Sequence, residues 1–566
     1  MPEGKAEQLG ASREQVADLS FADGALAAVH MCTDKVSGKL LKIRDNGAEI
    51  EGQGFYPFAE KLKIYRLYGT LKKYYTTDLC IGYDFTDFVI EDGEIQACLV
   101  VKEEAMENIR VLVKTSDFGS AFHEALEMKA DCDLSVISGP YEARQTTVVP
   151  AGETLMIGKD SELFAGGRVR IEPAVLTGHI SLLNVNRSQG VPSYRGSLEL
   201  EKQQDGIVVI NEVLLEEYLY AVVPSEMPAS YPLEALKSQA VCARTYAYDK
   251  MCRAGLPAYG AHVDDSAAFQ VYNNIEENAD TTRAVKETAG LALFYKGKTA
   301  QTYYYSTSCG YGADASVWES GNAGDYPYLT AQAIDTGNLS LTLAAKGQDT
   351  AAVMAPVTAQ AALLSQNEVF DGFIRTAEDK FYESKEPWYR WGYPVKQLDR
   401  WQLWEVLKQR QAADADGVLT LKEDGTWAQQ TPPDPGRIRE ICVAERGPGG
   451  VASRLLIEGE KASVLVCTEH NIRYALCDGT TEVIRQDGSR AQAASMVPSA
   501  FFSIETSKED GFVVGYTLNG GGFGHGVGLS QNGARNMALQ EVDAEGILEF
   551  FYKGCSLRSI YEEAQP

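Results

Sequence analysis

Glu226 is the residue whose surroundings best suit acid–base chemistry. It lies in the segment 222–228 (VVPSEMP), at a point where the pattern predicts the end of a strand. Apolar surroundings raise the pKa of a carboxyl group, so such a group can donate a proton near neutral pH, as cleavage of a glycosidic bond requires. The spacing equally allows Glu226 to cap the following helix or to pair with a basic side chain.

Three polar and glycine-rich segments, far apart in the sequence, do not fit an ordinary hydrophobic core: 221–248, 303–318 and 519–538. We expect them to assemble into one cleft. In the first segment, Lys237 and Arg244 lie seven residues apart on one predicted helix face, with small apolar residues between them. Two cations there would suit the acetamido, hydroxyl or lactyl groups of a wall sugar, although a solvated face is the commoner role of such residues.

The third segment places glycine at every second position from 520 to 528. In an extended conformation one face would then have no side chains, and backbone or ligand could approach closely. The opposite face would carry His525. Ser530 is expected to cap the following helix, with Gln531 near its positive end. A phosphate-binding loop is disfavoured, because no Lys-Ser/Thr pair follows the glycines.

The second segment presents hydroxyl groups after a tyrosine-rich strand. Ser306 and Ser308 can hydrogen-bond a sugar or simply complete a turn. Cys309 together with His525 would allow a Cys-His hydrolase, but no nucleophile-elbow motif supports that chemistry.

Several elements must position these residues. A helix is predicted over 232–248, and short strands over 40–44, 49–51, 63–68, 88–90 and 97–101 indicate a small β-barrel-like module. A helical stretch at 102–108 leads to strands at 109–113, 133–137 and 166–171. Residues 331–436 look looser, strands resume at 438–444 and 454–458, and a last helix is expected over 543–554 with Asp543 as its N-cap.

Composition limits the class of protein. A chain of 566 residues needs at least two domains, and its formal net charge of -27 disfavours nucleic acid as a partner. No run of about 18 apolar residues predicts a membrane span. The first twenty residues lack the apolar region of a signal peptide. Eleven cysteines without a CxxC pair argue against a disulfide framework and favour buried thiols.

Four motifs occur in the order found in the SpoIID/LytB family, which the chain therefore resembles: residues 222–248, STSCGY at 306–311 with Val317-Trp318 following, YPYL at 326–329, and GFGHGVGLSQNGA at 522–534. The resemblance implies an α+β, β-rich fold with a two-lobed catalytic domain and a cleft. The corresponding domains are a polar segment 1–27, a β-rich module 28–105, and a SpoIID-like domain 106–560 with a long insertion at about 331–436.

The resemblance also implies a lytic transglycosylase of cell-wall peptidoglycan, with Glu226 as its single catalytic acid and base. Lys237, Arg244, Ser306, Ser308, His525 and Gln531 are implied substrate-binding residues. Family enzymes favour glycan strands that lack stem peptides, and an extracytoplasmic location follows. The alternative is a noncatalytic wall-binding protein that enhances an N-acetylmuramoyl-L-alanine amidase.

Some family members bind zinc through Cys and His between this helix and the segment that corresponds to Gln270-Val271-Tyr272. Here that stretch offers His262 but no cysteine. The sequence therefore predicts no structural zinc, and no cofactor is implied.

Overall fold

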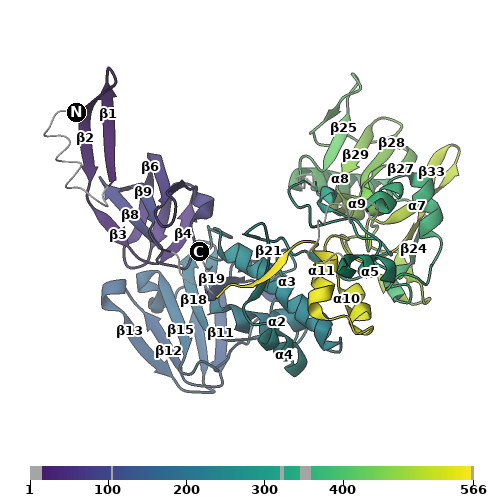
Figure 1. Cartoon of the computed structure of the whole chain (residues 1–566). Helices are drawn as coiled ribbons and strands as arrows, with labels where there is room; N and C mark the ends of the chain where they lie inside the picture. The colour runs from purple at the N-terminus through teal and green to yellow at the C-terminus, as the bar shows by residue number, and fades with distance from the viewer. Residues whose placement is uncertain (1–15, 103–105, 319–323, 345–357, 562–566) are drawn as a thin grey trace. The chain divides into compact units, whose positions relative to one another are not determined.

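A computed structural model describes residues 16–102, 106–318, 324–344 and 358–561 (Figure 1). The chain forms two compact units. Unit 1 is Met1–Ala229, Ala243–Ala292 and Ser559–Pro566, and unit 2 is Ser230–Cys242 and Leu293–Arg558. Helices and strands are mixed in a β-rich fold, which confirms that part of the predicted class.

The central element of unit 1 is a seven-stranded sheet. Its strands, in spatial order, are β13 (Gln145–Val149), β12 (Leu134–Ser138), β15 (Arg168–Pro173), β18 (Ser197–Gln203), β19 (Gly206–Leu214), β10 (Asn108–Val113) and β20 (Val263–Asp264). The three strands predicted for this region correspond to β10, β12 and β15. The helix predicted over 102–108 is wrong: Lys102, Met106 and Glu107 are not helical, and Asn108 begins β10, where it pairs with Leu214. Residues 103–105 lie outside the described residues.

A second, four-stranded sheet of unit 1 contains β14 (Thr154–Gly158), β11 (Ala125–Ala130), β16 (Ile180–Leu182) and β17 (Ser193–Tyr194). Its neighbouring strands are antiparallel throughout.

Three helices of the chain carry or support the predicted site: α2 (Leu215–Glu226), α3 (Leu233–Met251) and α4 (Ala279–Glu287). The helix predicted at 232–248 is confirmed as α3. The predicted strand before Glu226 is wrong, because the buried residues Leu215, Leu219 and Val222 recur with the period of a helix. Pro224 in the last turn precedes the end of α2 at Glu226.

The N-terminal module is a seven-stranded sheet with β3 (Lys35–Ser37), β4 (Leu40–Arg44), β5 (Gly47–Ile50), β6 (Gly54–Arg66), β7 (Lys72–Lys73), β8 (Thr86–Glu91) and β9 (Glu94–Val100). All five predicted strands are confirmed. Asp92 and Gly93 join β8 to β9 with φ of 50° and 80°, as a tight hairpin turn requires. Within the described residues the sheet runs from β3 to β4 without those two strands pairing, so the barrel stays a prediction.

Part of the predicted polar segment is also structured. β1 (Val16–Ala22) and β2 (Ala25–Cys32) form an antiparallel hairpin that is a sheet of its own (Figure 1). Residues 1–15 lie outside the described residues.

A buried and a half-buried ion pair join the module to the central sheet of unit 1. The Lys42 ammonium in β4 lies 2.7 Å from a carboxylate oxygen of Glu201 in β18, and Lys39 lies 2.7 Å from Glu212 in β19. Burial by itself would raise the pKa of Glu212, but Arg110 and Lys39 outweigh it and hold that pKa at about 2. The module is therefore an integral part of unit 1 and not a tethered appendage.

Unit 2 contains two five-stranded sheets. The first has β31 (Arg490–Gln492), β30 (Glu482–Arg485), β24 (Trp391–Val395), β33 (Phe512–Gly520) and β32 (Phe502–Glu509); the second has β26 (Trp427–Ala428), β25 (Val418–Leu421), β29 (Ser463–Cys467), β28 (Ala452–Gly459) and β27 (Ile438–Arg446). The strands predicted at 438–444 and 454–458 are confirmed as β27 and β28.

The helices wholly within unit 2 include α5 (Thr336–Ala344), α7 (Asn367–Ile374), α8 (Arg400–Ala413), α9 (Glu469–Ala475), α10 (Gln531–Ala538) and α11 (Ala544–Phe551). The stretch 331–436 is more regular than expected, since it supplies α5, α7 and α8 and strand β24 at the middle of a sheet. Asp543 caps α11 as predicted, although the helix ends three residues before the predicted end at Gly554.

All eleven cysteines lie in the described residues and are free thiols; six are buried and five half-buried. Within the described part of the chain, no helix is long and apolar enough to cross a membrane.

Candidate functional site

Glu226 is the last residue of α2 and is half-buried. Its carboxylate oxygen Oε1 accepts a hydrogen bond of 2.6 Å from the backbone N–H of Val271. The side chain is thus oriented by the segment that follows β20.

The neighbouring Ser225 strengthens the same junction. Its hydroxyl donates to the carbonyl of Ala221 at 2.7 Å and accepts from the N–H groups of Asn274 and Ile275, both at 3.1 Å. Two consecutive side chains at the end of α2 therefore hold one segment of backbone, residues 271–275.

Buried tyrosines lie beneath this junction. The rings of Tyr218 and Tyr272 are 4.8 Å apart, and both side chains are buried. Burial raises the pKa of Tyr218 far above its ordinary value, and the nearby charge of Glu226 adds to that effect. The Tyr218 hydroxyl donates to Gln270 Oε1 at 3.4 Å.

Arg244 is expected to bind sugar, which requires an accessible guanidinium, but its side chain is enclosed by protein. It is fully buried, and its guanidinium contacts both carboxylate oxygens of Glu216 at 2.8 and 2.7 Å. It also donates to the carbonyls of Leu291 and Val285 at 3.1 Å each. This bidentate, fully occupied geometry corrects the expectation of a sugar-binding side chain and indicates that Arg244 positions α3 against α2 and α4.

Lys237, on the part of α3 that belongs to unit 2, is half-buried and pairs with Glu234 at 2.9 Å. Glu234 also accepts the N–H of Ala544 at 2.9 Å, so this pair sits at the beginning of α11.

The second and third polar segments meet directly in unit 2. β23 (Tyr304–Tyr305) pairs in parallel with β34 (Leu529–Ser530), and Thr307 bridges to Phe523. Part of the first segment joins them, because Tyr231 donates to Asn532 at 2.5 Å and Gln531 donates to Gln239 at 3.3 Å. Lys237, Ser306, Ser308, His525 and Gln531 thus all belong to unit 2, whereas Glu226 and Arg244 belong to unit 1.

The glycines of the third segment adopt a conformation other than the extended one predicted. Gly522, Gly524, Gly526 and Gly528 have φ between 75° and 114°, in the region that favours glycine. A Cβ at Gly528 would lie 2.0 Å from the carbonyl oxygen of Tyr303. Close approach of backbone is therefore confirmed, but in a looped chain.

Ser308 is engaged by a residue that sequence reasoning missed. Glu383 is fully buried; its carboxylate accepts the N–H of Ser308 at 2.8 Å and the hydroxyl of Ser530 at 2.7 Å, and it also contacts the Ser308 hydroxyl. Burial raises the pKa of Glu383 to about 7. No local pattern in the stretch 331–436 points to this residue, because its partners are distant in sequence.

Ser530 also caps α10 as predicted, since its hydroxyl accepts from the N–H of Gly533. This places Gln531 at the first position of the helix. Ser306 is half-buried, and its hydroxyl lies 3.1 Å from that of Thr307.

His525 is held as a neutral imidazole. Its Nδ1 accepts the N–H of Val527 at 3.1 Å, so Nε2 carries the hydrogen that is donated to the carbonyl of Tyr304, also at 3.1 Å. Burial lowers its pKa to about 4. Tyr305 and Trp318 pack against the ring, with centroids 5.7 and 5.4 Å from it.

Cys309 does not suit nucleophilic catalysis. It is fully buried, and burial raises the pKa of its thiol to about 11, which keeps it protonated near neutral pH.

Both ring nitrogens of His262 are hydrogen-bonded to the backbone: Nδ1 accepts the N–H of Arg110 at 3.0 Å, and Nε2 lies 2.8 Å from the carbonyl of Ile81.

Two family models match parts of this chain. Residues 203–295, which contain Glu226 and Arg244, match the model of the stage II sporulation protein (SpoIID) family. Residues 315–528 match that of a domain of unknown function (DUF8618).

Over 375 residues the chain is 27% identical to the amidase enhancer of Bacillus subtilis (strain 168), covering 60% of this chain and 40% of that protein. It is 36% identical over 135 residues to stage II sporulation protein D of Bacillus amyloliquefaciens and 37% identical over 135 residues to that of Bacillus subtilis (strain 168); each match covers 21% of this chain and 38% of the relative. The chain thus spans about two fifths of the length of these curated relatives.

The segment around Glu226 lies in the SpoIID-matching part of the chain, and the relatives named above carry sporulation and amidase-enhancer names. The comparisons support the resemblance to the SpoIID/LytB family that the motifs predicted: residues 203–295 match the SpoIID domain, and the relatives include an amidase enhancer and stage II sporulation protein D.

Proposed function

We propose that this protein is a lytic transglycosylase that acts outside the cytoplasm on peptidoglycan glycan strands, preferably strands without stem peptides. The observation that carries the proposal is the orientation of Glu226. Its half-buried carboxylate ends a helix inside the SpoIID-matching segment and is directed by the N–H of Val271 at 2.6 Å.

In this reaction Glu226 donates its proton to the glycosidic oxygen that leaves N-acetylmuramic acid, and the bond from C1 to that oxygen breaks. The resulting carboxylate accepts the proton of the sugar's own C6 hydroxyl, whose oxygen bonds to C1 and closes a 1,6-anhydro ring. Water is not consumed, so one carboxyl group serves as acid and then as base, in contrast to the paired carboxylates of ordinary glycosidases. The Val271 N–H supports the carboxylate form between the two proton transfers.

Glycan binding is assigned in this proposal to the half-buried Lys237 and Ser306 of unit 2, and His525, whose two ring nitrogens are already hydrogen-bonded, is proposed to contact glycan through the face of its ring. Gln531 begins α10 beside them. Ser308 acts indirectly, because its N–H and hydroxyl contact Glu383.

A second candidate function is the noncatalytic enhancement of a cell-wall amidase. It is favoured by one comparison: the match to the amidase enhancer covers 60% of this chain, whereas each match to stage II sporulation protein D covers 21%. Such a protein would hold glycan without cleaving it.

The test is the product released from peptide-free glycan strands by the full chain and by Glu226→Gln. The wild type is expected to release sugars ending in 1,6-anhydro-N-acetylmuramic acid, and the variant to lose about a hundred- to ten-thousand-fold in rate while still binding strands. Glu217→Gln is the matched control, since Glu217 is also half-buried on α2.

Other outcomes would redirect the assignment. Products ending in reducing muramic acid would identify a hydrolase. Unchanged release by Glu226→Gln would remove that residue from the mechanism, and strand binding without release by any of the three proteins would favour the amidase enhancer.

A further inference from the structure

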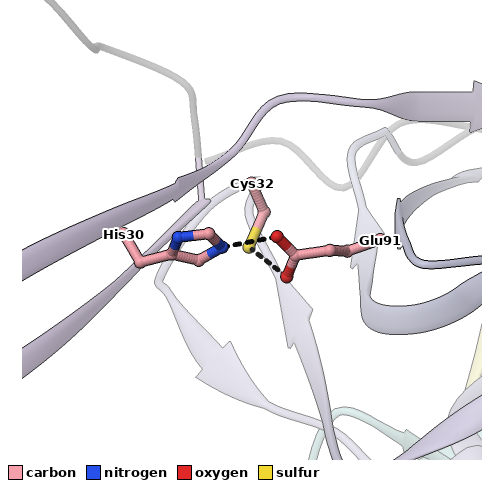
Figure 2. Close-up of side chains that lie close together, drawn as sticks. All are labelled: His30, Cys32 and Glu91. Atoms are coloured by element: carbon pink, nitrogen blue, oxygen red, sulfur yellow. Dashed lines mark hydrogen bonds and ion pairs between the residues drawn. The ribbon is translucent and has the colours of Figure 1, made fainter.

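Three side chains of different chemistry converge in the N-terminal module. His30 and Cys32 lie on β2 and Glu91 ends β8 (Figure 2). His30 Nε2 is 2.5 Å from Glu91 Oε1, and Cys32 Sγ is 3.7 Å from Glu91 Oε2. All three donor atoms lie within 4.8 Å of one another.

The backbone brings these residues together. His30 and Cys32 are two positions apart on a strand, so their side chains point to the same face. The chain then turns directly into β3, where Lys35 pairs with Val89 of β8, and the N–H of Ile90 donates to the carbonyl of Asp34 at 2.8 Å. This register places Glu91 opposite the end of β2.

We propose that His30, Cys32 and Glu91 form a zinc site. Imidazole nitrogen, thiolate sulfur and carboxylate oxygen are the three protein ligand types of Zn²⁺, with bonds of about 2.0–2.3 Å. A tetrahedral centre with such bonds separates its ligand atoms by roughly 3.3–3.8 Å. The separation of Cys32 from Glu91, 3.7 Å, falls within that range, that of His30 from Glu91, 2.5 Å, is shorter, and none exceeds 4.8 Å, so shifts of about an ångström suffice.

Charge also suits a divalent cation at this position. One thiolate and one carboxylate neutralise Zn²⁺, whereas the carboxylate of Asp18, across the hairpin from His30, is already paired with Lys63. Zinc binds cysteine as the thiolate, so its binding would displace the proton of the Cys32 thiol.

The site would stabilise the hairpin. A two-stranded hairpin is marginally stable alone in water, and most residues of β1 and β2 are exposed. Cys32, by contrast, is buried in a cluster with Val89 and Leu99. A metal bonded to β2 and β8 would fasten the hairpin to the module.

The proposed zinc site is not the one that some members of the SpoIID/LytB family have near the position of His262. The expectation of no zinc rested on the segment after His262, whereas these ligands lie on β2 and β8. The fourth ligand position would face solvent, because the side chain of His30 is 60% exposed.

The test uses the full chain stripped with a chelator and titrated with Zn²⁺ against a chromophoric competitor, and with Co²⁺ followed by absorption. We expect one metal per chain and a thiolate-to-cobalt band in the near ultraviolet. Cys32→Ser should abolish the band. His30→Gln, at an exposed position where folding is not at risk, should weaken zinc binding at least about tenfold.

Cys132→Ser is the control, because Cys132 is a half-buried free thiol between β11 and β12, outside the N-terminal module. This variant should leave the zinc affinity and the cobalt band unchanged. Zinc affinity that is equal in wild type, His30→Gln and Cys32→Ser would overturn the proposal. A cobalt spectrum without a thiolate band in the wild type would also overturn it.

Discussion

The backbone N–H of Val271 donates a 2.6 Å hydrogen bond to the carboxylate of Glu226. This bond joins the end of α2 to a segment 45 residues further along the chain. A helix end alone leaves a side chain several rotamers, whereas a backbone donor on another segment restricts the carboxylate to one orientation. The position of Glu226 therefore depends on whatever holds residues 271–275.

Ser225→Ala tests that dependence. The hydroxyl of Ser225 makes three hydrogen bonds, two of them with the N–H groups of Asn274 and Ile275. Their loss should cost about 1–2 kcal/mol in the free energy of unfolding, measured by urea denaturation, and should speed hydrogen exchange at 271–275. Ser507→Ala, at an exposed position of β32, should change neither quantity. Exchange rates at 271–275 equal to wild type would contradict a holding role for Ser225.

Arg244→Lys should destabilise unit 1 strongly. Lysine keeps the charge but cannot reproduce the two bonds to Glu216 together with those to Leu291 and Val285, and each buried acceptor left without its hydrogen bond typically costs about 1–3 kcal/mol. Thermal and urea unfolding measure the effect. Arg253→Lys, an exposed residue of the same region paired with Asp249, should cost less than about 1 kcal/mol. Similar losses in the two variants would argue against a structural role for Arg244.

Glu383 should make stability depend on pH. Its pKa rises from 4.5 to about 7 on folding, so between those values the folded state binds more protons than the unfolded state. The contribution of Glu383 to the free energy of unfolding is therefore fully present below about pH 4.5 and is lost as the pH rises to about 7. The loss is on the order of 3 kcal/mol.

Glu383→Gln keeps the shape of this side chain but cannot titrate. The difference in unfolding free energy between wild type and variant should therefore move in favour of the variant between pH 5 and pH 8. His525 has the opposite effect, because its lowered pKa makes the fold more stable as the pH rises. This effect is the same in wild type and variant and cancels in the difference between their unfolding free energies. Glu423→Gln, at an exposed turn, is the control with no expected trend. A difference that is constant over this range would refute the raised pKa.

Gly528→Ala should disrupt the loop between β33 and β34. Its φ of 75° and a Cβ position 2.0 Å from the Tyr303 carbonyl oxygen combine backbone strain with a steric clash. Gly511→Ala separates the two effects, because Gly511 has a φ of 81° but no atom within 4 Å of the added Cβ. Gly511→Ala should lower the free energy of unfolding by about 1–2 kcal/mol, and Gly528→Ala should lower it clearly more. Equal melting temperatures of the two variants would show that the clash is relieved by local movement.

Several features of this protein were predictable from short stretches of sequence. The period of apolar residues placed α3 within three residues at each end, alternation and turn residues located β4, β8 and β9, and Ser530 was recognised as the N-cap of α10. The motifs of the SpoIID/LytB family also identified the relatives and the segment around Glu226. These features depend on residues a few positions apart, whose preferences the local sequence carries.

The tertiary structure decided which polar side chains have partners. Arg244 is occupied by Glu216, Ser308 is held by Glu383, and Glu91 meets His30 and Cys32, although each pair is separated by at least 28 residues. The alternating glycines at 520–528 had suggested an extended segment, but the tertiary structure makes it a loop, packed at Gly528 against the backbone of Tyr303. A charge or a glycine acts through what lies beside it in space, and those neighbours are determined only when distant segments pack together.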